Sequence, residues 1–463
     1  MSLFAQKALK VIASSKRKFR SALRESFKYV RLGYEKVLDA KKIGFQHSME
    51  STAECAAQQA LPTLPAIQVS DELPVLTFAP IGSGKGTGAV IPTLLTNPRS
   101  MIVLDPKGEN FAVTARRRIE LGNEVYALDP FNLMNKKSDS LNPMDLLSLP
   151  GVCVESESVT LASAIGHDFQ SKRESFWDQH ALGLISGLVA LAGSGHFPAN
   201  LTTVRDHLVG QDPISKIYDA ISLLGSKNEE NTMAYRELAA FLHQSERETR
   251  PSVLASAGAY AKIFNSDRIM QSLDKSTIKL KDVIKGKPLT VYMIIPSSKL
   301  HSHRALLRLW LTTIIIAIQS RKERPAESTL LLIDECAQLG KFELLQTVIT
   351  LCRGYGVQPW LFFQSLFQLK ENYGESWRTF VDNAGAIQAF GFANMFGVEE
   401  WGKFFSRSPE QLLSMPPSDQ LLYISGKGTF QSQRMNYLVD EEFKGLFDEN
   451  PYFRNQPFNG ERN

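Results

Sequence analysis

A glycine-rich segment, Ala79–Gly88 with the sequence APIGSGKGTG, could bind phosphate. The phosphate-binding loop has the pattern G-x-x-x-x-G-K-[ST], which Gly84 and Lys85 match, whereas Ala79 replaces the first glycine and Gly86 replaces the hydroxyl residue. Glycines let backbone N–H groups surround a phosphate, and Lys85 would reach the β- and γ-phosphates. The alternative is a glycine-rich turn with a surface lysine. If the segment is a phosphate-binding loop, the nucleotide-binding residues are Ala79, Pro80, Ile81, Gly82, Ser83, Gly84, Lys85, Gly86 and Thr87.

Two adjacent carboxylates follow a hydrophobic segment further along the chain, TLLLIDE, which is typical of a buried strand. Asp334 would hold Mg²⁺, directly or through water, and Glu335 would act as the general base on the attacking water. The alternative is a strand that leads into a charged loop. Because a glycine loop with Lys85 and a strand ending in Asp334 and Glu335 occur together, we expect ATP hydrolysis with Mg²⁺.

The loop lacks the usual hydroxyl ligand for the metal at Gly86, and the next residue, Thr87, carries one. The sequence leaves open whether Thr87 reaches Mg²⁺. Magnesium keeps several waters in many sites, so Asp334, phosphate oxygens and water are the alternative ligand set.

Three further residues follow strands or helices of the same region. Arg353, in CRGYG, could stabilise charge on the transferred phosphoryl group, or it is an ordinary cation at a helix C-terminus. Gln364, in WLFFQSL, could respond to the γ-phosphate, or it caps a helix. Asp105, in VLDPKGEN, could lie within reach of the nucleotide, or it caps the next helix. The predicted catalytic residues are Lys85, Glu335, Arg353 and Gln364.

The elements around these residues alternate between strand and helix. Buried strand patterns at PVLTFAP, MIVLDP and EVYALDP are separated by helical spacing, and the alternation returns at LTVYMII and continues to DQLLYISG. Such alternation predicts an α/β fold with a mostly parallel sheet. Residues 145–285 carry almost no strand pattern and predict an all-α insertion. We therefore expect a nucleotide-binding domain in two parts, 74–144 and 286–463.

The first residues differ in charge from the rest of the chain. Residues 1–50 contain 12 Lys and Arg against 4 Asp and Glu, whereas the remainder contains 40 against 44. Apolar residues at helical spacing predict a basic amphipathic helical arm over 1–45, followed by a linker over 46–73. The arm could pack on the body, contact anionic lipid or a partner, or bind DNA. We see no transmembrane helix or signal peptide, and the spacing of the four cysteines indicates neither a zinc site nor a disulfide framework.

Several ordered motifs together resemble the type IV coupling proteins, the ATPases of bacterial conjugation and type IV secretion. They run from APIGSGKGTGAVIPTLL through VLDPKGENF, LNPMD, FWDQHALGLISGL and LLLIDECAQLGK to FFQSLFQLKENYG and QRMNYLVD. The resemblance implies a RecA-like P-loop NTPase core with an inserted all-α domain, homo-hexamers around a channel and ATP between subunits. It implies that the Gly-Lys-Gly loop is a working variant. It also assigns Arg353 as an arginine finger acting in trans and Gln364 as a motor-coupling residue.

The expected function is therefore an ATPase that recruits and moves DNA, relaxase-bound, or protein substrate into a type IV secretion channel. We expect ATP and Mg²⁺ as cofactors. The expected partners are DNA, contacted with weak sequence specificity, a relaxase or other secreted protein, and channel components. Family members usually begin with transmembrane helices, whereas this sequence shows none and has the basic arm instead. We therefore expect a bacterial cytoplasmic protein that is peripheral at the inner membrane through its arm or a membrane subunit. The alternatives are a nucleotide-binding cargo adaptor with little turnover and a cytosolic DNA motor unrelated to secretion.

Overall fold

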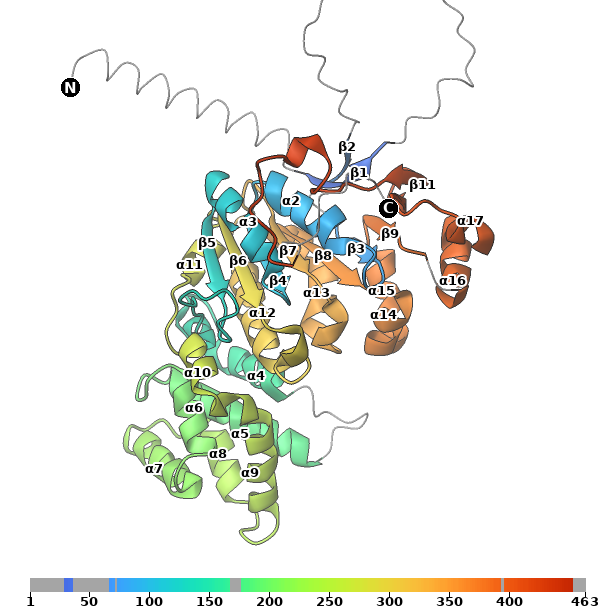
Figure 1. Cartoon of the computed structure of the whole chain (residues 1–463). Coiled ribbons are helices and arrows are strands. Elements are labelled where there is room, and N and C mark those ends of the chain that lie inside the picture. Colours follow the sequence, from blue (N-terminus) through green and yellow to red (C-terminus); the bar gives the residue numbers. More distant parts are fainter. Residues whose placement is uncertain (1–28, 36–65, 71–72, 167–175, 393–394, 453–463) are drawn as a thin grey trace, which may run out of the picture.

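The chain folds around one eleven-stranded sheet that is covered by helices on both faces (Figure 1). The computed structural model describes residues 29–35, 66–70, 73–166, 176–392 and 395–452. The strands are β1 (Val30–Tyr34), β2 (Ala66–Val69), β3 (Val75–Phe78), β4 (Met101–Asp105), β5 (Glu124–Leu128), β6 (Leu289–Ile294), β7 (Thr329–Ile333), β8 (Val357–Phe363), β9 (Ala386–Ala389), β10 (Asp419–Ile424) and β11 (Gly428–Gln433).

The sheet has a large parallel part and a smaller antiparallel part. Its order is β2-β1-β11-β10-β9-β3-β8-β7-β4-β6-β5, and the strands from β9 to β5 run parallel. The strands β10, β11, β1 and β2 extend it by antiparallel pairing. This arrangement confirms the α/β class with a mostly parallel sheet.

Residues alternate between two hydrophobic cores along the central strands, because successive side chains of a strand point to opposite faces. In β7, Leu331 and Ile333 join the core beneath α12 (Arg304–Gln319) and α13 (Glu343–Leu351). Leu330 and Leu332 join the opposite core, beneath α2 (Ile91–Thr96) and α3 (Glu109–Glu120). Burial on both faces explains why these strands read as continuous apolar runs.

Between β5 and β6 the described residues form only helices and connecting turns. They are α4 (Val154–Gly166), α5 (Phe176–Gly193), α6 (Leu201–Leu208), α7 (Pro213–Ser226), α8 (Met233–Leu242), α9 (Thr249–Tyr260), α10 (Asp267–Asp274) and α11 (Leu280–Ile284). Figure 1 shows most of this group, α5 to α10, below the sheet. The strand-free character of this stretch matches the expectation for 145–285, and its division into a separate domain stays a prediction.

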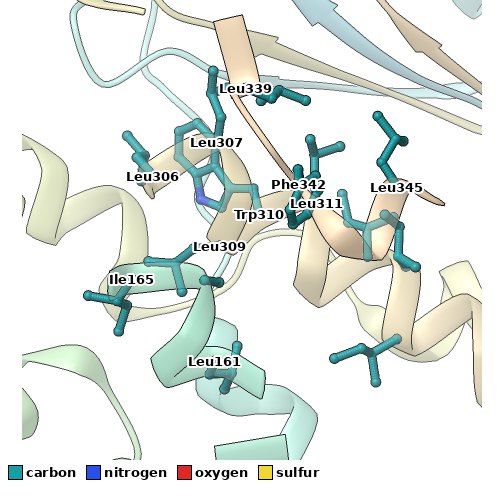
Figure 2. Packing of buried hydrophobic residues seen from close by; sticks show 14 of the residues in the cluster. Leu161, Ile165, Leu306, Leu307, Leu309, Trp310, Leu311, Leu339, Phe342 and Leu345 are labelled. Carbon is teal, nitrogen blue, oxygen red and sulfur yellow. The ribbon is translucent and has the colours of Figure 1, made fainter. Parts of the chain in front are cut away.

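Trp310 of α12 connects these helices to the sheet region. Figure 2 shows its ring between Leu161 of α4 on one side and Leu339 and Phe342, which follow β7, on the other. Trp310 is fully buried. The packing joins the helical group to the segment that carries the predicted carboxylates.

The remaining helices follow the strands of the second half of the chain: α14 (Leu366–Tyr373), α15 (Trp377–Asp382), α16 (Met395–Phe405) and α17 (Pro409–Leu413). No helix among the described residues is long and apolar enough to cross a membrane.

The helical expectation for the arm is wrong over Val30–Tyr34, which form β1. The apolar residues Val30 and Tyr34 are four apart, and this spacing fits both one face of a helix and one face of a strand. Tertiary pairing decides the outcome, because β1 lies between β2 and β11 and buries its side chains. The predicted linker likewise contains a strand, β2. The other residues of the arm, 1–28 and 36–45, lie outside the described part of the chain.

Candidate nucleotide-binding site

Four predicted site residues follow the carboxyl ends of four adjacent strands. Ala79 follows β3, Gln364 follows β8, Asp334 follows β7 and Asp105 ends β4, and these strands are neighbours in the order β3-β8-β7-β4. Because parallel strands end at one edge of the sheet, the fold brings these residues to one side of the molecule.

The glycine-rich segment forms a loop between β3 and a single turn of π-helix at Gly86–Val90. Gly82 and Gly84 have φ of 77° and 86°, a left-handed conformation that glycine adopts without strain. A turn closes from Ser83 N–H to the Pro80 carbonyl over 3.3 Å. Ala79 is buried and donates its N–H to Phe363, so the first glycine position of the pattern is here a core residue.

Lys85 is held at the centre of this loop. Its Nζ donates to the carbonyl of Ala79 at 2.9 Å and lies 3.6 Å from Oε1 of Glu335. The side chain is only 9% exposed. A buried ammonium that contacts oxygen atoms and lies against the backbone of a glycine-rich loop fits the position of a phosphate-binding lysine.

The two carboxylates differ in their surroundings. Asp334 is half-buried, and desolvation together with the charge of Glu335 raises its pKa to about 6, although Lys85 and Lys107 oppose the shift. Its Oδ1 accepts the backbone N–H of Glu335 at 3.0 Å. Glu335 has φ of 53°, so the chain turns sharply at this residue. That turn directs Glu335 toward Lys85 and Gln364 rather than along the strand direction.

Gln364 contacts Glu335 directly. Its Nε2 donates to Oε2 of Glu335 at 2.7 Å, and its backbone N–H donates to Oε1 of Gln368 in α14 at 2.8 Å. The structure therefore brings Lys85, Glu335 and Gln364 together, and it connects them to the first turn of α14.

Asp105 lies at the same edge and also caps a helix. Its Oδ2 accepts the N–H of Phe111 at 2.9 Å at the start of α3. Burial, with smaller contributions from the charges of Asp334 and Glu109, raises its pKa to about 7. The capping role weighed from the sequence is thus present, and Asp334 is close enough to influence its charge.

Thr87 and Arg353 do not join this group in the same chain. The Thr87 hydroxyl donates to the Gly84 carbonyl at 3.2 Å. Arg353 lies exposed in a 3-10 turn, Cys352–Tyr355, directly before β8 begins. That position is at the amino ends of the parallel strands, whereas Lys85 lies at their carboxyl ends. The assignment of Arg353 as a finger that acts in trans, in the site of another copy, stays a prediction.

Two residues near the loop carry no role in the sequence analysis. Lys107 is exposed, and its charge acts on Asp334. Arg434 donates from Nη1 to the carbonyl of Ser83 in the loop. Lys107 could have been found from the sequence because it lies two residues after Asp105. The contact of Arg434 with Ser83 could not, because the two residues are 351 positions apart.

The family described as "Type IV secretory system Conjugative DNA transfer" matches residues 58–408. The chain belongs to this conjugative DNA transfer family. Among its relatives, "Conjugal transfer protein TraG" of Escherichia coli is 28% identical over 313 residues, which is 64% of this chain and 49% of that protein. "Protein VirD4" of Rhizobium radiobacter is 26% identical over 419 residues, covering 81% of this chain and 58% of that protein. The chain thus spans about half the length of these relatives.

Solved structures confirm the RecA-like fold expected of this conjugative DNA transfer family. "Plasmid coupling protein TrwB" in complex with the non-hydrolysable ATP analogue ADPNP superimposes with a TM-score of 0.63 at 15% identity, over 88% of this chain and 94% of that one. The same protein in complex with ADP and Mg²⁺ gives a TM-score of 0.62 at 15% identity over the same shares. "VirB4 of Thermoanaerobacter pseudethanolicus" gives 0.51 at 11% identity, over 88% of this chain and 96% of that one.

Proposed function

We propose that this chain is an ATPase that moves DNA, with its attached relaxase, or a protein substrate into a type IV secretion channel. The observation that carries the proposal is the group formed by Lys85, Glu335 and Gln364 beside the half-buried Asp334. Membership of the conjugative DNA transfer family supports the choice of DNA as the substrate.

The residues divide the chemistry among them. The glycine loop and Lys85 would bind the phosphates of ATP, and Asp334 would hold Mg²⁺ together with phosphate oxygens and water. When bound there, the metal would supply positive charge to the transferred phosphoryl group. Glu335, held between Lys85 and Gln364, accepts the proton of the attacking water. Arg353 of a neighbouring copy contributes its guanidinium to the same site.

The position of Arg353 supports an assembly of several copies. A site completed by a second copy requires a ring or a dimer, and we propose the homo-hexamer of the coupling proteins. The proposed location is the cytoplasmic face of the bacterial inner membrane, through the basic segment before β1 or a membrane subunit, with channel components as partners.

The test is ATP turnover of the purified chain with and without DNA. We expect Lys85→Ala to abolish nucleotide binding, because the loop loses its only buried cation. We expect Glu335→Gln to bind nucleotide and to lose about a hundredfold or more in turnover, the contribution of a general base. The exposed Lys444 supplies a control variant, Lys444→Ala, with unchanged turnover. Nucleotide binding by the wild type with no turnover above that of Glu335→Gln, at any protein or DNA concentration, would contradict the motor and favour the cargo adaptor.

A further inference from the structure

A segment after β11 packs against the glycine loop. We call residues 434–442 the C-terminal strap. Tyr437 donates its N–H to the carbonyl of Thr87 at 3.1 Å, and Arg434 donates to the carbonyl of Ser83. The strap therefore contacts the loop at residues before and after Lys85 in the sequence.

The Arg434 side chain contacts three separate parts of the chain. Its Nη1 donates to Ser83 and its Nη2 donates to the carbonyl of Pro417, while its guanidinium stands 4.7 Å from the centre of the Phe390 ring. One guanidinium thus connects the glycine loop, the turn before β10 and the end of β9. A lysine cannot reproduce this bridge, because it has a single nitrogen.

The charge of Arg434 is not matched by a carboxylate at hydrogen-bond distance. Both of its hydrogen-bond acceptors are backbone carbonyls, and its Nε is buried without a hydrogen-bond partner among the described residues. Asp419 acts on it only through longer-range attraction. A partly buried cation without a paired anion favours the approach of negative charge, and the proposed ligand of the adjacent loop is a polyphosphate.

The glycines of the loop accommodate the strap. A side chain at Gly84 would place its Cβ 3.0 Å from Nη1 of Arg434, and one at Gly88 would place it 2.9 Å from the carbonyl oxygen of Met435. Glycine at positions 84 and 88 thus allows Arg434 and Met435 of the strap to lie close to the loop.

We propose that Arg434 is a positioning residue of the nucleotide site, which fixes the Ser83–Gly84 backbone so that the loop N–H groups face the phosphates of ATP. The inference rests on the proposed ATP-binding function. It adds a contribution from the last part of the fold, in the same chain, to a site whose other residues lie between Ala79 and Gln364. Arg434 acts through the loop and does not take part in the bond-breaking step.

The experiment measures the dissociation constant of a fluorescent ADP analogue with Mg²⁺, and the KM and kcat for ATP, for the full chain and its variants. We expect Arg434→Ala to weaken binding and to raise KM by about tenfold, the equilibrium effect of one charged hydrogen bond, with kcat changed less than about threefold. Arg434→Lys should lie between alanine and wild type. Lys427→Ala, which removes an exposed cation from the turn between β10 and β11, should match wild type.

Hydrogen exchange separates positioning from general stability. In Arg434→Ala without nucleotide, we expect faster exchange at the loop amides 81–86 and unchanged exchange at 329–333 in β7. If Arg434→Ala does not fold, Arg434→Gln and Arg434→Lys carry the same measurements. Wild-type affinity and KM in any folded alanine or glutamine variant would overturn the inference, even if its melting temperature falls. A wild-type chain that binds no nucleotide would instead overturn the proposed function itself.

Discussion

Gln364 holds the proposed general base in place, and this makes its own contribution testable. Its Nε2 is 2.7 Å from one oxygen of Glu335, and Lys85 is 3.6 Å from the other. Removing the amide in Gln364→Ala leaves Glu335 free to turn toward Lys85. We expect turnover to fall about tenfold to a hundredfold, with the affinity for nucleotide within about twofold of wild type. Steady-state ATPase assays and nucleotide titration check the two effects, and an unchanged kcat would contradict the role of Gln364.

Asp105 predicts a dependence of stability on pH. Burial raises its pKa in the folded chain to about 7, above the usual 3.8, so the folded state binds its proton more tightly than the unfolded state. The free energy of unfolding therefore decreases as the pH rises from about 4 to about 7. The raised pKa of Asp334 likewise makes the free energy of unfolding decrease as the pH rises. In urea unfolding across this range we expect Asp105→Asn to show a shallower decrease than wild type. An equal slope in both proteins would contradict the assignment.

At the scale of elements, the strap and the glycine loop make a matched pair of substitutions possible. A methyl group at Gly88 would meet the Met435 carbonyl at 2.9 Å, whereas one at Gly86 would meet nothing within 4 Å. Neither glycine has positive φ. We expect Gly88→Ala to reduce stability by about 1–3 kcal/mol, as overpacking does, and Gly86→Ala to be neutral or slightly stabilising. Thermal unfolding without nucleotide measures both, and equal effects would show that the strap can yield.

The elements also show which strands could be predicted from the sequence. The parallel strands were predictable, because each is an apolar run bounded by glycine, proline or charge, and Asp334, Glu335 and Gln364 follow such runs directly. Of the antiparallel extension, β10 was predicted within DQLLYISG, whereas β11, β1 and β2 were not. Apart from Gly428 and Phe430, every residue of β11 is polar, and β1 has a spacing that suits a helix equally well. Their pairing depends on contacts between residues some 400 positions apart, such as Arg31 with Glu442.

For the whole molecule, the placement of Arg353 predicts complementation between inactive chains. Lys85 and Arg353 lie at opposite ends of the parallel strands, so each proposed site combines Lys85 of one copy with Arg353 of the next. Arg353→Ala and Lys85→Ala should each be inactive alone. A mixture contains interfaces in which the Arg353→Ala copy supplies Lys85 and the Lys85→Ala copy supplies Arg353, and these sites are intact.

We therefore expect the mixture to regain ATPase activity, at most about a quarter of wild type for random equal mixing at one site per interface, and to regain it more fully as protein concentration rises. The measurement is a titration of one variant into the other at constant total protein. No recovery at any ratio, with assembly confirmed by light scattering, would place the action of Arg353 elsewhere.

The bracing of the loop by residue 434 has a consequence for how the protein is made. Ser83 and Gly84 leave the ribosome early, but the Arg434 side chain that contacts Ser83 is 351 residues further along. Arg31 of β1 likewise pairs with Glu442, which is 411 residues further along. Contacts of this separation form late in folding. If Arg434 positions the loop as proposed, a nascent or C-terminally clipped chain lacks this contact and binds nucleotide more weakly than the full chain.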